Sequence, residues 1–359
     1  DAITSGDNNV AVGYNSLSAL TTGSKNIAVG AHALAANSTG GANVGVGYGA
    51  LNVNSTGQYN TAVGDLALSV NSTGSQNTAL GKNAVAVNTT ASNNTGIGYN
   101  TMASNTTGAD NTSVGAFALD ANTTADNCTA VGKHSLGANT TGIENVAVGN
   151  YTLDANTTGT HCTAVGYNAL SANTSAVNNV GIGAQAMSDT TGGAYNVAVG
   201  NDALKTATTG AYNVAIGQSA LNKKTTSASN TAIGSLAGEV VTTGANNLFL
   251  GFEAGKTGSP GGAITTASNE VCIGDENISA ANIQVDWTIA SDKRDKTDVN
   301  QLDLGLDFIN QLEPVTYRWD KRSKYSNDQS ITPDGTHKEE QLEGGFLAQD
   351  VEVIEAQYG

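Results

Sequence analysis

The feature that most constrains this chain is a glycine that returns at every seventeenth position. Each copy follows an aliphatic residue, and the copies are Gly13, Gly30, Gly47, Gly64, Gly81, Gly98, Gly115, Gly132, Gly149, Gly166, Gly183, Gly200, Gly217, Gly234 and Gly251. A fixed period of this length indicates stacked repeats, in which each unit buries its apolar side only against its neighbours. Only 39% of residues are hydrophobic and 5% aromatic, but the period argues against disorder.

Each repeat is typical of β-structure. The residue before the glycine is Val, Ile or Leu, and the residue two places earlier is Val, Ile, Leu or Thr, an alternation that predicts a strand. A second apolar anchor follows four residues after the glycine, as at Leu17 and Leu34, and a polar turn such as residues 37–40 comes next. We expect each coil to consist of a strand, a glycine bend, a short strand and a polar turn. The sequence therefore predicts an all-β fold, a parallel β-solenoid (β-roll) of 17-residue coils, stacked at about 4.8 Å.

Asparagine stands four residues before the repeat glycine in thirteen of fifteen coils, and Cys128 and Cys162 replace it in the other two. The first members are Asn9, Asn26, Asn43, Asn60, Asn77, Asn94 and Asn111. Amides in register can hydrogen-bond along a stack, so we predict a structural ladder that faces inward. A binding role for these residues is the alternative. The two cysteines are two coils apart, too far for a disulfide within the chain.

A second asparagine column lies in the polar turn and creates N-x-S/T sequons. Its members are Asn37, Asn54, Asn71, Asn88, Asn105, Asn122, Asn139, Asn156 and Asn173. Turn chemistry accounts for these residues. In a secreted eukaryotic protein the same residues would instead carry glycans.

Between the two apolar strand residues stands a small one, such as Ala11, Ala28 or Gly45. Strand alternation turns it to the opposite face. If the larger aliphatic side chains face inward, a smooth Ala and Gly face lies outside. We therefore hypothesise that this small-residue face packs against sister chains about a threefold axis.

The composition changes near residue 290, because residues 291–359 contain as many charged residues, 23, as the preceding 290. We divide the chain into a β-solenoid shaft at 1–255, an irregular last coil and junction at 256–290, and a separate domain at 291–359. The net charge of −16 disfavours a nucleic-acid partner, because phosphate binding needs clustered Lys and Arg. No apolar run is long enough to predict membrane insertion.

The charged segment contains four ordered motifs, at residues 291–296 (SDKRDK), 304–315 (LGLDFI with LEPV), 317–319 (YRW) and 345–351 (GFLAQDV). In these motifs it resembles the peptidase S74 family, the intramolecular chaperone of endosialidase and of other phage tail spikes and fibres. The resemblance implies a small α+β chaperone domain, partial in this chain, that trimerises and guides assembly of the preceding shaft. It also implies autoproteolysis between Ser291 and Asp292 by a Ser-Lys dyad, with Ser291 as nucleophile and Lys296 as base.

The repeats also resemble the heads of trimeric autotransporter adhesins, whose coils contain the pattern Asn-x-Ala-Ile-Gly, as at residues 213–217. Those heads form a parallel β-roll in a trimer. Their usual coil is shorter, so the coil length here implies an enlarged turn.

Together, the resemblances imply a structural and adhesive homotrimeric fibre. The leading interpretation is a bacteriophage tail fibre for host attachment, located in the virion, whose partners are other tail proteins and a host cell-surface receptor such as a glycan. Tyr14, Tyr48, Tyr99 and Tyr167 are either exposed platforms for sugars or ordinary turn residues. A bacterial cell-surface trimeric adhesin is the first alternative, and an ice-binding β-solenoid that uses threonine pairs such as Thr106 and Thr107 is the second. We expect no cofactor, no metal and no external substrate.

Overall fold

The computed structural model describes residues 4–223, 226–280, 306–318, 334–336, 338 and 340–358. Contacts within the chain divide it into two units, Asp1–Asn277 and Ile278–Gly359. Each unit is described by itself.

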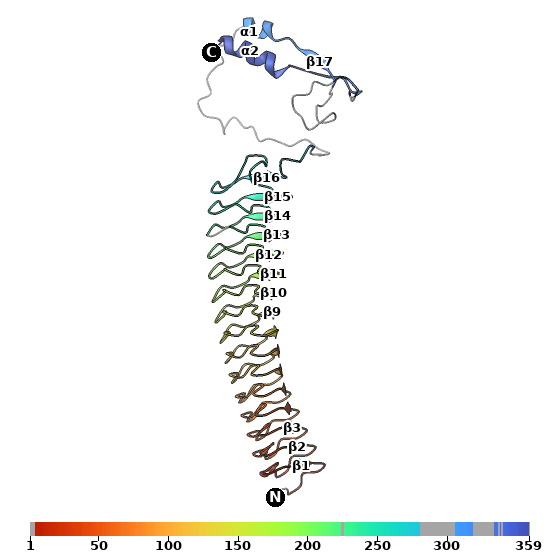
Figure 1. Cartoon of the computed structure of the whole chain (residues 1–359), viewed down its shortest axis with the longest axis vertical. Coiled ribbons are helices and arrows are strands. Elements are labelled where there is room, and N and C mark those ends of the chain that lie inside the picture. The colour runs from red at the N-terminus through yellow and green to blue at the C-terminus, as the bar shows by residue number, and fades with distance from the viewer. Residues whose placement is uncertain are drawn as a thin grey trace. The chain divides into compact units, whose positions relative to one another are not determined.

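The first unit is a stack of windings with one three-residue strand in each (Figure 1). All sixteen strands form one parallel sheet in chain order. In β1–β14 each strand residue pairs with the residue 17 positions later, as Val10 does with Ile27. The predicted parallel β-solenoid of 17-residue coils is confirmed. The strands are β1 (Val10–Val12), β2 (Ile27–Val29), β3 (Val44–Val46), β4 (Thr61–Val63), β5 (Thr78–Leu80), β6 (Thr95–Ile97), β7 (Thr112–Val114), β8 (Thr129–Val131), β9 (Val146–Val148), β10 (Thr163–Val165), β11 (Val180–Ile182), β12 (Val197–Val199), β13 (Val214–Ile216), β14 (Thr231–Ile233), β15 (Leu248–Leu250) and β16 (Val271–Ile273).

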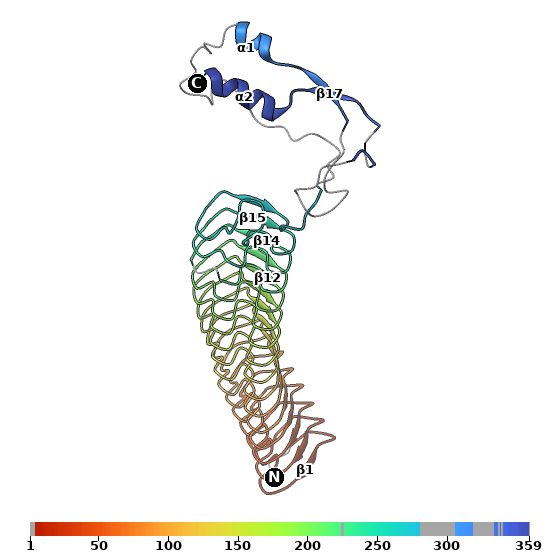
Figure 2. The ribbon, with the colours of Figure 1, turned by 45° about the horizontal axis from the view of Figure 1, so that its top comes forward.

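Hydrogen bonds between coils are not confined to the sheet. In the turn after β2, the backbone N–H of Leu34 donates to the carbonyl of Ala50 at 2.9 Å, and in the polar turn Ala42 donates to Ser24 at 2.9 Å. Hydrogen bonds therefore join neighbouring coils on several sides. Figure 2 shows the stacked coils in a tilted view. Pairing of buried backbone groups in this way removes the cost of leaving them unsatisfied.

The repeat glycine is required by its backbone angle and by its surroundings. Gly132 has φ of +130°, and a Cβ placed on it would lie 2.4 Å from the carbonyl oxygen of Gly149 in the next coil. Left-handed φ values are accessible to glycine without steric cost. Because the same contact recurs in successive coils, a side chain here would push the windings apart.

The strands face the opposite way from the prediction. The middle residues Ala28 and Ala62 are fully buried, whereas Ile27 and Val29 on either side of Ala28 are 40% and 36% exposed. The expectation that aliphatic residues point inward and small residues outward is wrong. The interior beside the strand is already filled by leucine anchors from the turn, so only a small side chain fits there.

The leucine anchors lie in turns, so the predicted second short strand is also wrong. Leu34 and Leu51 are fully buried, and both have φ of +52°. A left-handed conformation costs a non-glycine residue about 1–2 kcal/mol. Full burial of a leucine contributes about 1.5–3 kcal/mol, which offsets that cost.

Phe249 shows how tightly the interior volume is matched. It replaces the usual small residue in the middle of β15, and it is fully buried. Gly238 and Gly255 occupy the adjacent anchor positions, where a Cβ would lie 2.9 Å and 2.4 Å from the phenyl ring. One large side chain thus fills the space that two leucine anchors would otherwise occupy.

The period lengthens once, between Gly251 and Gly274. Register is nevertheless kept, because Leu248 of β15 pairs with Val271 of β16. The additional residues form turns in which the buried Ser259 accepts a hydrogen bond from the N–H of Gly255 at 3.0 Å. The insertion is therefore absorbed outside the sheet.

The second unit contains helix α1 (Leu306–Gln311), helix α2 (Ala348–Tyr358) and the strands β17 (Val315–Tyr317) and β18 (Glu343–Gly345). The two strands are antiparallel, and Val315 pairs with Gly345. These elements agree with the expected small α+β domain.

Candidate functional site

The asparagines before the strands form a continuous interior column. The side-chain amide of Asn60 donates to Asn43 Oδ1 at 3.2 Å and to the carbonyl of Gly74 at 2.9 Å. Asn77 repeats the pattern, because its amide donates to Asn60 Oδ1 at 3.1 Å. At the start of the stack, Asn26 donates to Asn9 Oδ1 in the same way. From Asn26 onward these side chains are buried, which leaves their amides inaccessible to an external ligand.

The turn asparagines form a second buried column. Asn71 donates to Asn54 Oδ1 at 2.7 Å and to the carbonyl of Gly74 at 2.8 Å. Its side chain is fully buried. In the folded shaft these sequons do not present their amides at the surface, so turn chemistry accounts for them and glycosylation does not.

Cys128 and Cys162 complete the first asparagine column, whereas Cys272 is the middle residue of β16. Cys128, Cys162 and Cys272 are free and buried. The sulfur of Cys128 lies 3.3 Å from the carbonyl of Gly142, in the place of an asparagine amide. Burial raises the pKa of the Cys128 thiol to about 11, and burial also raises the pKa of Cys162. Both thiols are therefore protonated and unreactive at neutral pH.

An unbroken line of five rings runs over five consecutive coils. We call it the aromatic strip: Tyr99, Phe117, His134, Tyr151 and Tyr167. The rings of Phe117 and His134 are stacked at 5.0 Å between centroids with 4° between their planes. Tyr99 and Tyr167 end the line and stand nearly perpendicular to their neighbours, at 86° and 88°. Tyr99 is 47% exposed and Tyr167 52%.

The sequence prediction included only Tyr99 and Tyr167 of this strip. Those two follow the repeat glycine directly, whereas Phe117, His134 and Tyr151 follow it by two residues. The sequence does show the middle of the strip, because an aromatic residue or histidine stands two residues after the repeat glycine in three consecutive coils. Tyr14 and Tyr48 form a shorter group with His32, at 5.4 Å and 5.8 Å between centroids.

Two carboxyl groups, which we call the carboxyl notch after the missing side chain of Gly137 between them, lie beside the aromatic strip. Asp120 and Asp154 are two coils apart, and the residue between them in the column is Gly137. A Cβ on Gly137 would lie 2.8 Å from Asp154 Oδ1 and 3.6 Å from Asp120 Oδ1. Partial burial raises the pKa of both carboxyl groups, and the charge of His134 opposes that rise. The notch therefore offers hydrogen-bonding oxygens beside aromatic rings.

The threonine pairs do not form two equivalent outward columns. The hydroxyl of Thr106 donates to the carbonyl of Thr123 in the next coil at 2.9 Å. Only Thr107 of that pair is exposed. One exposed column remains, so the geometry does not favour a paired threonine surface for ice.

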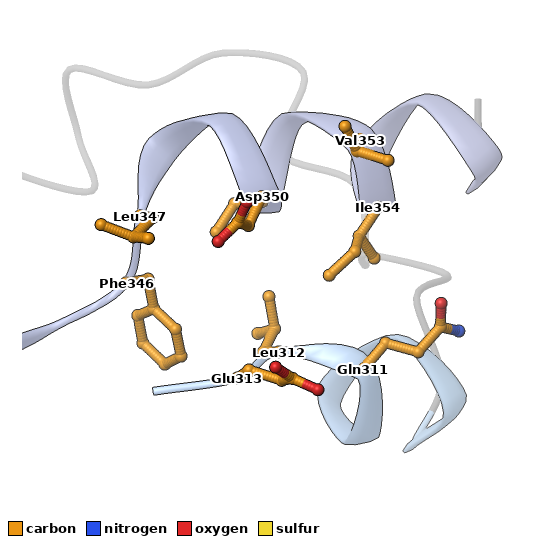
Figure 3. Close-up of a pocket in the computed structure, with 9 residues that line it drawn as sticks. Gln311, Leu312, Glu313, Phe346, Leu347, Asp350, Val353 and Ile354 are labelled. Atoms are coloured by element: carbon orange, nitrogen blue, oxygen red, sulfur yellow. The ribbon is translucent and has the colours of Figure 1, made fainter. Parts of the chain in front are cut away.

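The predicted catalytic pair, Ser291 and Lys296, lies outside the described residues. In the second unit, a hollow of about 260 Å³ lies between α1 and α2. Figure 3 shows Leu312 and Ile354 directed into it, with Phe346 at one end. Its volume is below the ~300–1,000 Å³ of typical small-molecule sites, and its lining is largely apolar.

The described residues also bear on metal binding and membrane insertion. In the described ranges, no three His, Cys, Asp or Glu side chains gather where they could hold a metal ion. None of the helices described there combines the length and apolar character that a membrane span requires.

The comparison with protein families decides the nature of the C-terminal segment. Residues 291–359 match the Peptidase_S74 family model, described as the chaperone of endosialidase. The chain carries a Peptidase_S74 domain after its β-solenoid. No curated protein and no solved structure matches the chain. The family match covers the charged segment alone, so the shaft is understood from its own geometry.

Proposed function

We propose that this protein is a rigid homotrimeric fibre, the shaft of a bacteriophage tail fibre for host attachment, whose Peptidase_S74 domain guides assembly. The observation that carries the proposal is a sixteen-stranded parallel stack joined to a chaperone-of-endosialidase domain at residues 291–359. Chaperone domains of this family act in trimeric fibres. A stack of near-identical coils suits a spacer that holds contacts away from a particle.

The second unit supports the chaperone role because it exposes large apolar side chains. Phe346, Leu347 and Val353 are 53%, 45% and 62% exposed. Such residues in close sequence favour burial against other chains. A trimerising domain would cover them and bring three shafts together at one end.

The test of this function uses the full chain and the native particle. Light scattering of the Ser291→Ala chain, in which the proposed cleavage is blocked, is expected to give three times the 36.0 kDa chain mass, and electron microscopy is expected to show a thin rod. Antibodies against the shaft are expected to label phage tails. Labelling of a bacterial surface in the absence of phage would overturn the tail-fibre assignment and favour a cell-surface adhesin. A monomeric mass would overturn the trimeric fibre.

We also propose that the domain cleaves the chain between Ser291 and Asp292. A lysine desolvated in an assembled trimer loses basicity and can accept the proton of a serine hydroxyl, so Lys296 would activate Ser291. Mass spectrometry is expected to find a fragment that ends at residue 291, which Ser291→Ala and Lys296→Met each abolish. Absence of that fragment from the assembled wild-type trimer would rule out cleavage.

The aromatic strip is the proposed receptor contact, and its chemistry fits a neutral glycan. Exposed tyrosine rings can stack on sugar faces, and Asp120 and Asp154 can accept hydrogen bonds from sugar hydroxyls. A glycan array is expected to show binding that Tyr99→Ala and Tyr167→Ala reduce at least tenfold. Tyr195→Ala removes a tyrosine of similar exposure outside the strip and serves as the control. Equal losses in all three variants would contradict a role for the strip.

A further inference from the structure

The outer face of the sixteen-stranded sheet carries an apolar lane along the shaft. The third residue of every strand is Val, Leu or Ile, and the first is aliphatic or threonine. No strand residue of β1–β16 is charged. Exposure at the third position varies along the stack, from half-buried at Val46 to 47% at Ile273 and 56% at Val12. We call the first and third strand positions together the aliphatic lane.

The lane is larger than a single soluble chain normally leaves uncovered. Nine of the sixteen third-position side chains are 36–56% exposed, and the other seven are half-buried. With their first-position neighbours they expose on the order of 1,000 Å², whereas exposed apolar patches of monomers are about 300–600 Å². A stable interface buries about 800 Å² on each partner. The lane alone therefore supplies the area that a specific complex needs.

Charge distinguishes the lane from the rest of the winding. Contacts between charged or titratable side chains of neighbouring coils lie in the turns, as in the ion pair between Lys82 and Asp65 at 3.3 Å and the contact between His161 Nε2 and Glu144 at 3.1 Å. The chain has a net charge of −16, so two copies repel wherever their charged turns meet. Contact through the uncharged lane keeps those turns apart.

The spacing of side chains along the lane indicates which partner can cover it. Its rungs repeat at the strand spacing of about 4.8 Å, so a partner with any other rise would lose register after a few rungs. A second copy of this chain has the same rise and the same apolar side chains at each level. Rung-by-rung contact along the shaft is available to such a copy.

We propose that the aliphatic lane is the surface through which three copies of this chain pack along a common axis. The inference rests on the proposed trimeric fibre and specifies which face turns inward. Side chains of the same rung then meet across the axis. The small-residue face that the sequence suggested is unavailable, because those residues are buried within each chain.

Spin labels at two exposed positions of one coil test the proposal in the full chain. Ile97→Cys places a label in the lane, and Ser104→Cys places one further along the same coil, in the turn. The native cysteines are buried, and unmodified protein measures their background labelling. Since packed sheets lie about 10 Å apart, the label at 97 is expected to give interchain distances under about 20 Å. The label at 104 is expected to give clearly longer distances.

Charge substitution provides a second measurement. Ile97→Lys, Val148→Lys and Ile182→Lys together place charges on three rungs of the lane. The matched control, Ser104→Lys with Ala155→Lys and Asp189→Lys, changes the turns of the same three coils. We expect the lane variant to raise the concentration needed for trimer formation at least 100-fold, and the control less than threefold.

The outcomes separate this inference from the proposed function. A trimer whose labels at 104 lie closer together than those at 97 would overturn the lane and leave the fibre intact. Equal effects of the two triple-lysine variants on trimer formation would also overturn it. A wild-type chain that stays monomeric would overturn both.

Discussion

The anchor residues of the shaft and the apolar side chains of the second unit are buried to different extents. In the shaft, Leu34 and Phe249 are fully enclosed within one chain, and the asparagine columns satisfy polar groups in the same interior. In the described part of the second unit, Phe308 is buried but Leu342 and Phe346 are more than half exposed. The contrast indicates that the shaft has a complete core of its own. In the proposed trimer, the C-terminal domain would cover these side chains with other chains.

The sharpest way to break this comparison is to separate two coils. Gly132→Val places a side chain against the backbone of Gly149 and imposes a branched residue at φ of +130°. We expect a loss of at least about 4 kcal/mol in the free energy of unfolding, as for a combined clash and strained backbone. Thermal unfolding followed by circular dichroism measures it. Gly192→Ala is the control, because its nearest neighbour would be 4.0 Å from the new Cβ; similar losses in both variants would refute the close-contact argument.

Cavity formation tests whether the shaft core is complete within one chain. Phe249→Ala is expected to cost about 3–5 kcal/mol in unfolding free energy, the usual range for a buried aromatic. Adding Gly238→Leu restores the leucine and alanine arrangement of other coils and is expected to recover at least half of that loss. Denaturant unfolding of both single variants and the double variant gives the coupling energy. Additive effects would show that the two sites do not share one space.

The asparagine column offers a smaller effect with a natural comparison. Asn60→Leu removes the partner of Asn43 and Asn77 and leaves buried groups unsatisfied, at an expected cost of about 2–4 kcal/mol. Asn60→Cys is expected to cost less, because cysteine stands in the same position at Cys128 and Cys162. Chemical denaturation ranks the two variants. A cysteine variant no more stable than the leucine variant would count against the column as a polar framework.

The pH response of the carboxyl notch is the smallest expected effect. Partial burial raises the pKa of Asp154 above 3.8, and His134 opposes that rise. The folded shaft thus holds the proton more tightly than the unfolded chain. The resulting stabilisation is complete below about pH 3.8 and is lost as the pH rises through the folded pKa. Asp154→Asn should therefore raise stability at pH 7 by less than about 0.5 kcal/mol; a larger benefit at pH 3 than at pH 7 would reverse the argument.

The stack could be predicted from the sequence because no residue other than glycine fits at the repeat glycine position. The close contact at Gly132 and its equivalents forces the same residue into every coil, so the period is visible without a structure. The C-terminal domain was predicted from motifs, and the family match at residues 291–359 confirms it. Self-cleavage by Ser291 and Lys296 stays a prediction, because neither residue is among those described.

Side-chain direction could not be deduced from the pattern. Alternation shows that Ile27 and Val29 share a face, but it does not say whether that face is inside. Larger aliphatic residues usually occupy the interior, and this tendency led to the wrong face. The deciding facts are tertiary: Leu34 reaches the interior from a left-handed turn and leaves room only for a small residue such as Gly45. The aromatic strip was partly missed because its three middle rings stand at a different turn position from the two tyrosines at its ends.

Strands pair at a constant spacing of 17 residues, as Val10 does with Ile27. This pairing does not fix how many coils the stack contains. Each coil contacts only the coil before it and the coil after it. Loss or duplication of seventeen codons would therefore remove or add one whole coil and leave the contacts among the other coils unchanged. An insertion whose length is not 17 residues is tolerated where it extends a turn, as between Gly251 and Gly274. Unequal recombination within the gene can therefore change the length of the stack in steps of one coil while the C-terminal domain is inherited intact.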